Sequence, residues 1–315
     1  MIRQLEDSVR SRSFIYSFLI VKNGFLVMEV YNSHFTYLND YDVRSVAKSF
    51  ISALVGIAIR EKYIDSVGQS LLHFFPEYDT PGLDPRKRTI TIEHLLTMRA
   101  GFDYTDGLDY SQIFNDHSDW MKETINLPLK FNPGERFSYA SIQANLLSGI
   151  VTKASGMSTR DFAQKYLSGP AHVPVRVWDR DPQGYYIGAT GMNFNPRDMA
   201  RFGYLHLNNG FDGSRSVIPP DWIRRTVQPS TDGVGSWGDL RDLNYGYLWW
   251  LNISDKDSLC IAAGFGGQFI IVVPGAQMVI VSTCEANVSP SRGNAQSDYV
   301  LMLATRLVLP AVIEK

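Results

Sequence analysis

The sequence predicts an α/β fold in which an antiparallel β-sheet is flanked by helices and carries an inserted, mainly helical lobe. Strand-like segments lie at both ends of the 315-residue chain, whereas helix-like periodicity dominates its middle. Two strands alone rarely form a stable sheet in water, so we expect the terminal strands to pair with one another. The predicted sheet domain comprises residues 1–44 and 196–315, and the predicted helical domain comprises residues 45–195. Ligands commonly bind between such lobes, so a cleft is expected at their boundary.

The first elements follow from a turn signal and an apolar run. Residues 14–21 and 25–31 are rich in strand-forming residues, and Asn23-Gly24 between them is a strong signal for a tight hairpin. Further along, Ser49–Ile59 is apolar on nearly every face. This pattern is typical of a helix buried in a core.

The later elements are predicted from capping residues and from a change of period. The predicted helices are Thr91–Met98 with Thr91 as N-cap, Ile142–Ser155 before Gly156, and Pro196–Asn208 after Asn195. From residue 245 the apolar runs are short and are separated by Gly, Pro and Asn, which predicts strands. These strands are Tyr245–Leu251, Ser258–Ala263, Gln268–Val273 and Met278–Thr283, and Gln296–Leu309 is predicted to be a closing helix.

Composition excludes several classes of function. A net charge of -2 gives no broad attraction to nucleic acid or anionic lipid, so no nucleic-acid partner is expected. The two cysteines form no CxxC motif, and the six histidines are scattered without an HExxH motif, so neither a metal site nor a cofactor is expected. No apolar run is long enough for a membrane span. The sequence does not indicate an oligomeric state.

The N-terminus has some features of a secretory signal. Arg3, Arg10 and Arg12 precede the apolar residues 14–21, but no small-residue cleavage site follows. The hairpin interpretation accounts for the same residues. We therefore expect a soluble protein and favour the cytoplasm, with the periplasm or the exterior as the alternative if a leader has been removed.

Ser45 and Lys48 are the first candidates for chemistry. They lie three residues apart in Ser45-Val46-Ala47-Lys48, so both side chains are predicted on one face of the buried helix at its N-terminal end. A hydroxyl next to an amine at this position is an arrangement suited to an activated nucleophile. The alternative is an N-cap serine followed by a solvated lysine.

Two later segments supply further candidates. Tyr139 and Ser141 follow the turn Asn132-Pro133-Gly134 and precede a predicted helix, a loop position suited to function. The alternative roles are ring packing for Tyr139 and helix capping for Ser141. Gly264 lies in a glycine-rich stretch between two predicted strands, where a ligand or another backbone can approach closely. The alternative there is an ordinary hairpin turn.

Together these segments resemble a known family. Ser45-Val46-Ala47-Lys48, Tyr139-Ala140-Ser141 and Ala262-Ala263-Gly264 resemble the three ordered motifs of the penicillin-recognising serine hydrolases. Residues 91–101, 191–205 and 245–250 also resemble the class C β-lactamase branch. Within that branch the chain is especially similar to the 6-aminohexanoate-oligomer hydrolases and related carboxylesterases, over nearly its whole length. A β-lactamase/DD-peptidase-like fold is therefore implied.

The resemblance implies a role for each candidate residue. Ser45 would be the acylated nucleophile, and Lys48 and Tyr139 would share the work of general base. The backbone N–H groups of Ser45 and Phe265 would bind the oxyanion, with Ser141 and Gly264 beside the substrate. The strand order of the family would separate Cys260 from Cys284 by one strand, which is too far for a disulfide, so two free thiols are expected.

Two departures from the family pattern affect the predicted substrate. Position 141 is Ser where the second motif commonly ends in Asn, and position 262 is Ala where the third commonly begins with Lys or His. Ala262 and Ala263 offer neither charge nor hydroxyl to a substrate carboxylate. A penicillin or D-alanyl peptide would thus lose a contact worth roughly 1.5–3 kcal/mol.

The leading prediction is a serine hydrolase that cleaves neutral esters or linear amides through an acyl-enzyme on Ser45. The alternatives are a true β-lactamase or D-Ala-D-Ala peptidase, and a non-catalytic ligand-binding homologue. The expected partner is a small ester, amide or lactam substrate. An α/β-hydrolase is excluded because the chain has no GxSxG motif.

Overall fold

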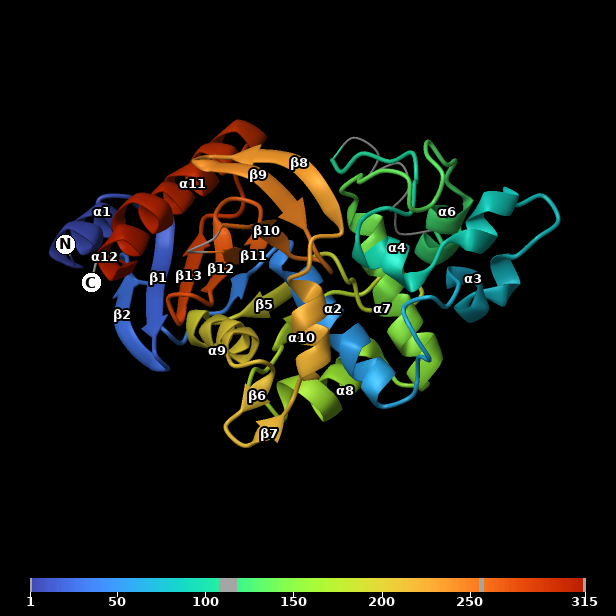
Figure 1. Cartoon of the computed structure of the whole chain (residues 1–315), viewed down its shortest axis with the longest axis horizontal. Helices are drawn as coiled ribbons and strands as arrows, with labels where there is room; N and C mark the ends of the chain where they lie inside the picture. Colours follow the sequence, from blue (N-terminus) through green and yellow to red (C-terminus); the bar gives the residue numbers. More distant parts are fainter. Residues whose placement is uncertain (1, 108–117, 255–257, 314–315) are drawn as a thin grey trace.

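An eight-stranded antiparallel sheet is the frame of the computed structural model, which describes residues 2–107, 118–254 and 258–313 (Figure 1). The strand order is β2-β1-β13-β12-β11-β10-β9-β8. The N-terminal hairpin therefore pairs with the last strand of the chain, in a register that aligns Phe18 with Ser282. This confirms the predicted single sheet built from both ends of the chain. The strands are β1 (Ile15–Lys22), β2 (Phe25–Tyr31), β8 (Thr231–Trp237), β9 (Leu240–Tyr245), β10 (Trp250–Asn252), β11 (Leu259–Gly264), β12 (Gln268–Val273) and β13 (Met278–Cys284).

The predicted hairpin forms at the edge of this sheet. Its two turn residues, Asn23 and Gly24, have φ angles of 52° and 81°. Positive φ at both central positions is the geometry of a type I′ turn, which matches the twist of the flanking strands.

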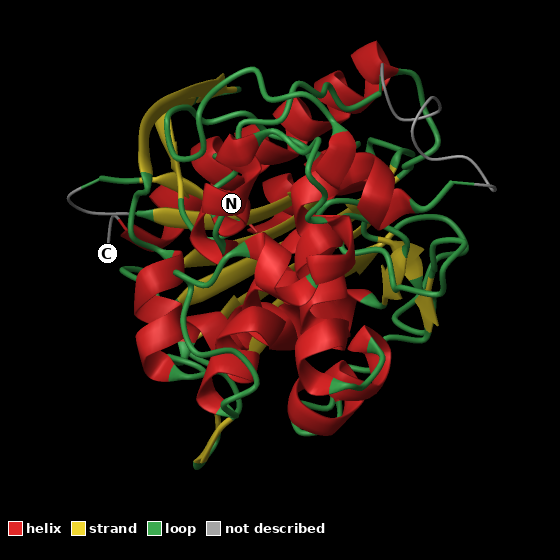
Figure 2. Cartoon of the chain, turned by 90° about the vertical axis from the view of Figure 1, so that its right-hand side faces the viewer, coloured by secondary structure: helices red, strands yellow, loops and turns green. Residues whose placement is uncertain are grey.

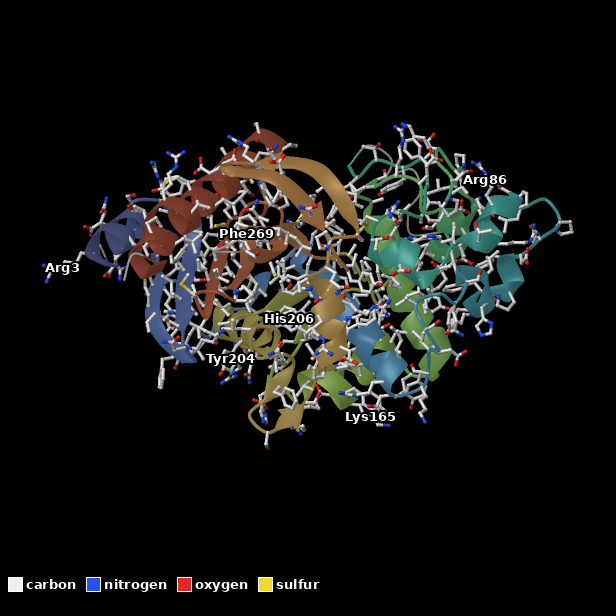
Figure 3. All side chains as sticks on the ribbon, in the orientation of Figure 1. Arg3, Arg86, Lys165, Tyr204, His206 and Phe269 are labelled. Carbon is white, nitrogen blue, oxygen red and sulfur yellow. The ribbon has the colours of Figure 1, made fainter. Side chains whose placement is uncertain are left out.

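Helices cover both faces of the sheet and create two cores. On one face lie α1 (Ile2–Arg10), α11 (Pro290–Met302), η4 (Leu303–Val308) and α12 (Leu309–Ile313); on the other lie α2 (Val46–Arg60) and α9 (Pro196–Leu207) (Figure 1). Residues of β12 alternate between the cores, since Phe269 and Ile271 join the α11 side whereas Ile270 and Val272 join the α2 side. Figure 3 shows Phe269 in the sheet and His206 on α9.

Helix α2 is the buried helix that the sequence predicts. Its residues from Val46 to Ala58 are all buried. The helix packs in the same core as residues of β11, β12 and the helical lobe. Gly56 allows α10 (Pro220–Thr226) to approach, because a Cβ at this position would lie 2.3 Å from the Trp222 ring. The burial explains why the run is apolar on all faces.

The middle of the chain folds into the helical lobe. Figure 2, viewed from that side, shows its helices in front of the strands. The predicted caps are confirmed: Thr91 forms a capping box with His94, and Gly156 ends its helix with φ 69°. The elements are α3 (Leu71–Phe74), η1 (Pro76–Tyr78), η2 (Pro85–Thr89), α4 (Ile92–Leu96), α6 (Trp120–Asn126), α7 (Ser141–Ser155), α8 (Thr159–Ala163) and η3 (Gln164–Ser168).

Short strands connect the two parts of the molecule. β3 (Tyr41–Asp42) and β4 (Val177–Trp178) each pair with β5 (Met192–Phe194), and β6 (Phe211–Asp212) pairs with β7 (Arg215–Ser216). Strand β3 leads directly to Ser45, so this small sheet fixes the approach to α2.

The prediction of one continuous strand over Tyr245–Leu251 is wrong for the middle of that range. β9 ends at Tyr245 and β10 begins at Trp250, and the turn between them carries Leu248 at φ 60°. The Leu248 N–H donates to Leu96 O at 3.0 Å, and the Ser49 hydroxyl donates to Leu248 O at 2.7 Å. Contacts with two distant helices thus interrupt an apolar run that resembles a strand. The closing helix begins at Pro290, earlier than the predicted Gln296.

Cys260 lies on β11 and Cys284 on β13, with β12 between them. Both thiols are buried and unpaired, as the sequence predicts. In the part of the chain that the structure describes, no helix is long and apolar enough to cross a membrane.

Candidate active site

Ser45 and Lys48 are in direct contact. Lys48 Nζ donates to Ser45 Oγ at 2.6 Å and to Ala189 O at 3.2 Å. The lysine is only 1% exposed, and the Ser45 side chain makes no capping hydrogen bond to the helix. The alternative of a capping serine with a solvated lysine is therefore wrong. A buried amine holds the hydroxyl instead.

The residue before Ser45 has an unusual backbone conformation. Arg44 has a φ of 51°, in the left-handed region that non-glycine residues rarely adopt. Its N–H donates to Asp42 Oδ1 at 2.9 Å, and its guanidinium donates to Ala286 O at 3.1 Å. Strain of this kind persists only where the surroundings fix it.

Tyr139 lies next to Lys48. Lys48 Nζ is 5.0 Å from the centroid of the Tyr139 ring. Two further aromatic rings pack against Tyr139. Trp250 stacks on Tyr139 with ring centroids 5.4 Å apart, and Tyr245 meets Tyr139 edge-on with centroids 6.3 Å apart. Burial raises the pKa of Tyr245 well above its usual value, so this phenol stays protonated beside Tyr139.

Gln143 fixes the segment that carries Tyr139. Its side-chain amide donates to Ser138 O at 3.0 Å and accepts from the Ala100 N–H at 3.0 Å. The Ser138 N–H donates to Met98 O at 2.8 Å. Sequence reasoning missed Gln143. The signal available was a glutamine on the apolar face of a predicted helix.

Asn145 fixes the carbonyl that receives Lys48. Its Oδ1 accepts from the N–H groups of Gly188 and Ala189 at 3.1 and 3.0 Å. Gly188 lies so close to α7 that a Cβ there would be 2.0 Å from Ala144 O. Asn145 is 3% exposed and was not predicted, because nothing in the sequence relates it to residues 188–189.

Ser141 is bonded to a carboxylate that the sequence did not indicate. Its hydroxyl donates to Asp106 Oδ2 at 2.9 Å, and its N–H donates to Asp106 Oδ1 at 3.0 Å. Ser141 is the first residue of α7 and does not cap the helix itself. Asp106 takes the capping role from outside the helix.

Gly264 allows β11 to contact the loop before Ser45. A Cβ on Gly264 would lie 2.3 Å from Val43 O, so no larger residue fits without movement. The following turn is held by Gln296, whose amide donates to Gly266 O at 2.9 Å. The backbone N–H groups of Ser45 and Phe265 donate to no backbone carbonyl of the described residues.

The third motif offers no charge. Ala262 is 1% exposed in the core that includes α2, and Ala263 belongs to the core on the other face of the sheet. The nearby Arg44 is paired with Asp42, with Nε 3.2 Å from Oδ2. Among residues 2–107, 118–254 and 258–313, no group of three His, Cys, Asp or Glu side chains is arranged to hold a metal.

A family model described as Beta-lactamase matches residues 39–304. The chain belongs to the beta-lactamase family. The members of this family are hydrolases that act on small molecules. The likeness to solved structures agrees with the mixed α/β fold described above.

This beta-lactamase-family chain is similar to one named hydrolase in sequence and to two solved structures in fold. It is 22% identical over 284 residues to the 6-aminohexanoate-dimer hydrolase of Paenarthrobacter ureafaciens, covering 84% of this chain and 71% of the relative. EstCE1, a hydrolase with promiscuous acyltransferase activity, has a TM-score of 0.74 at 15% identity, over 95% of this chain and 97% of EstCE1. The octameric penicillin-binding protein homologue of Pyrococcus abyssi has a TM-score of 0.70 at 18% identity, over 96% of this chain and 77% of the homologue.

Proposed function

We propose that this chain is a serine hydrolase that cleaves esters or linear amides through an acyl-enzyme on Ser45. The observation that carries the proposal is the 2.6 Å contact between Lys48 Nζ and Ser45 Oγ, made by an amine that is 1% exposed. An adjacent base is what a serine hydroxyl needs in order to act as a nucleophile. A protein that only binds a ligand would have no need of this pair.

The reaction begins when the base formed by Lys48 and Tyr139 takes the proton of the Ser45 hydroxyl. Ser45 Oγ then bonds to the carbonyl carbon, and the carbonyl oxygen becomes an oxyanion. The N–H groups of Ser45 and Phe265, which donate to no backbone carbonyl of the described residues, donate hydrogen bonds to the oxyanion and stabilise its charge. The loss of one such donor typically costs roughly 10²–10³ in rate. The proton passes to the leaving alcohol or amine as its bond to the carbonyl carbon breaks.

Deacylation repeats these steps with water. The same base takes a proton from water, the hydroxide attacks the acyl carbon, and the proton returns to Ser45 Oγ as the acid leaves. The carbonyl of Ala189 keeps Lys48 in place throughout, at 3.2 Å from Nζ. The proposal also keeps the predicted division into residues 1–44 with 196–315 and residues 45–195. Tyr139 then comes from the helical lobe and Phe265 from the sheet.

The third motif argues against penicillin turnover as the main activity. Ala262 and Ala263 are buried and uncharged, and Arg44 is already paired. A substrate carboxylate would lose a charge-assisted contact worth roughly 1.5–3 kcal/mol. Esters and linear amides without a carboxylate lose nothing.

A hydrolysis screen tests the proposal. Short- and long-chain esters, linear amides and a cephalosporin are compared on the wild type, Ser45→Ala and Lys48→Met. We expect ester turnover that Ser45→Ala abolishes and Lys48→Met lowers by at least about 10²-fold, since general base catalysis contributes this much. Ser52→Ala is the matched control, because Ser52 is a buried serine of the same helix whose hydroxyl has no partner among the described residues.

A serine-reactive phosphonate gives a second readout. It should label the wild type and Ser52→Ala but not Ser45→Ala. Equal labelling of Ser45→Ala would favour a non-catalytic binding protein. Cephalosporin hydrolysis as efficient as that of the best ester would favour a true β-lactamase.

A further inference from the structure

We infer that the site selects substrates that carry a cationic group, such as a quaternary ammonium, close to the reacting carbonyl. The inference rests on the proposed function and narrows its substrate class. Its basis is a carboxylate bonded to Ser141, two residues after Tyr139, and a set of aromatic rings packed around Tyr139, together with the uncharged third motif.

The carboxylate belongs to Asp106. It is exposed, and its two oxygens lie 2.9 and 3.0 Å from Ser141 Oγ and N. Ser141 is two residues after Tyr139, so their Cα atoms are at most about 7 Å apart. No Lys, Arg or His of the described residues forms an ion pair with Asp106. Among the described residues, the partners of this carboxylate are therefore the uncharged N–H and hydroxyl of Ser141.

The aromatic surface consists of Phe137, Tyr139, Trp237, Tyr245 and Trp250. Trp250 contacts the other four, with ring centroids at 6.0 Å from Phe137, 5.4 Å from Tyr139, 6.2 Å from Trp237 and 5.1 Å from Tyr245. All except Tyr245 are only partly buried. The faces of Trp and Tyr rings attract cations, and quaternary ammonium groups are recognised in this way.

The third motif adds no cation to the site. In much of the family this position holds a cation, whereas Ala262 here is buried and apolar. Arg44 is committed to Asp42 and to Ala286 O. Apart from the buried Lys48, the described part of the site thus combines one carboxylate that has no ion-pair partner there with four partly exposed aromatic rings, which favours a cation over an anion.

Asp106 also has a structural role, because it accepts from the first N–H of α7. A helix N-terminus attracts negative charge, and this attraction alone would account for a carboxylate here. The two roles differ in their consequences. A pure cap predicts no preference between cationic and neutral substrates, whereas a binding role predicts a preference that depends on the charge of Asp106.

Two pairs of isosteric esters separate these roles. In the first pair the cation is in the acyl group: the p-nitrophenyl esters of 4-(trimethylammonio)butanoic acid and 5,5-dimethylhexanoic acid. In the second it is in the alcohol: the butyrates of choline and 3,3-dimethylbutanol. The readout is the ratio of kcat/KM for the cationic ester to that for its neutral isostere. We expect a ratio of about 3 to 30 for at least one pair, falling as salt is added.

Asp106→Asn keeps one acceptor oxygen for the helix cap, replaces the other oxygen by an NH2 donor and removes the charge. We expect it to lower the ratio by about three- to tenfold. Asp103→Asn is the matched control, because Asp103 is another exposed carboxylate of the same loop and lies 4.0 Å from Lys130 Nζ. This control should keep the wild-type ratio.

Ratios near one for both pairs, or equal ratios in Asp106→Asn and the wild type, would overturn the inference while leaving the proposed hydrolase intact. If no ester is cleaved, the proposed function fails instead. Binding of benzyltrimethylammonium, followed by tryptophan fluorescence, then still tests Asp106. We expect binding several-fold weaker in Asp106→Asn than in the wild type, and equal affinities would refute its role.

Discussion

The contact between Gly264 and the loop before Ser45 gives a prediction that joins stability to activity. In Gly264→Ala the new methyl group would lie 2.3 Å from Val43 O and 3.1 Å from Arg44 Cβ. The two backbones must therefore separate by roughly 1 Å, and overpacking of this kind typically costs about 1–3 kcal/mol. The lower entropy of the unfolded chain returns about 0.4–1 kcal/mol. We expect a net loss of about 1–2 kcal/mol in the free energy of unfolding.

The effect on activity should exceed the effect on stability. Val43 and Arg44 directly precede Ser45, so the displacement moves the nucleophile relative to Lys48. A misplacement of about 1 Å can cost about 10²-fold in rate. We expect Gly264→Ala to remain folded, with a melting temperature lower by about 1.5–3 °C, and to lose most of its ester turnover.

The assay combines thermal unfolding with kcat for the best ester substrate. Gly82→Ala is the matched control, because no atom lies within 4 Å of a Cβ built there. This control should match or slightly exceed wild-type stability and keep full activity. Wild-type kcat and melting temperature in Gly264→Ala would refute the idea that close approach of β11 positions Ser45.

Two further predictions concern buried groups. Burial lowers the pKa of His206 to about 4, so the unfolded chain binds this proton from about pH 6.5 downward while the folded protein does not. The free energy of unfolding therefore includes the full contribution of this group above pH 6.5 and falls by about 3 kcal/mol as the pH drops to 4. Urea unfolding should show a smaller loss in His206→Leu. An unchanged pH dependence in this variant would contradict the assignment. Burial raises the pKa of the Cys260 thiol to about 12, and Cys284 is also buried, so a thiol reagent should titrate no group in the folded protein and two after unfolding. A rapid reaction of either thiol in native protein would show that the sheet opens around it.

Local sequence signals identified the elements whose geometry depends on neighbouring residues. The Asn23-Gly24 turn, the Thr91 cap and the Gly156 helix end all form as predicted, because backbone conformation at such positions follows from the residue type. The same holds for Ser45 and Lys48. Their spacing of three residues on a helix requires the side chains to be neighbours, and the two atoms are 2.6 Å apart.

Residues that act across the fold were not identifiable in this way. Asp106 is bonded to Ser141, and Asn145 orients Ala189, yet each pair is separated by more than 30 residues of sequence. The break between β9 and β10 has the same origin, since Leu96 and Ser49 hold Leu248 in the turn. A hydrogen bond between distant segments produces no periodic pattern of apolar residues in the sequence of either segment.

The sequence by itself determined the single sheet, the buried helix α2 and the pairing of a serine with a lysine at its start. Its motifs and their order also assign the chain to a family, which the match over residues 39–304 shows. Only the tertiary structure decided what accompanies the three motifs: a carbonyl oriented by Asn145 next to Lys48, aromatic rings packed around Tyr139, and Asp106 bonded to Ser141, the position where the family motif commonly has Asn. The physical reason is that charge and close packing at a site depend on which distant segments meet there, whereas helix and turn formation depends on residues a few positions apart.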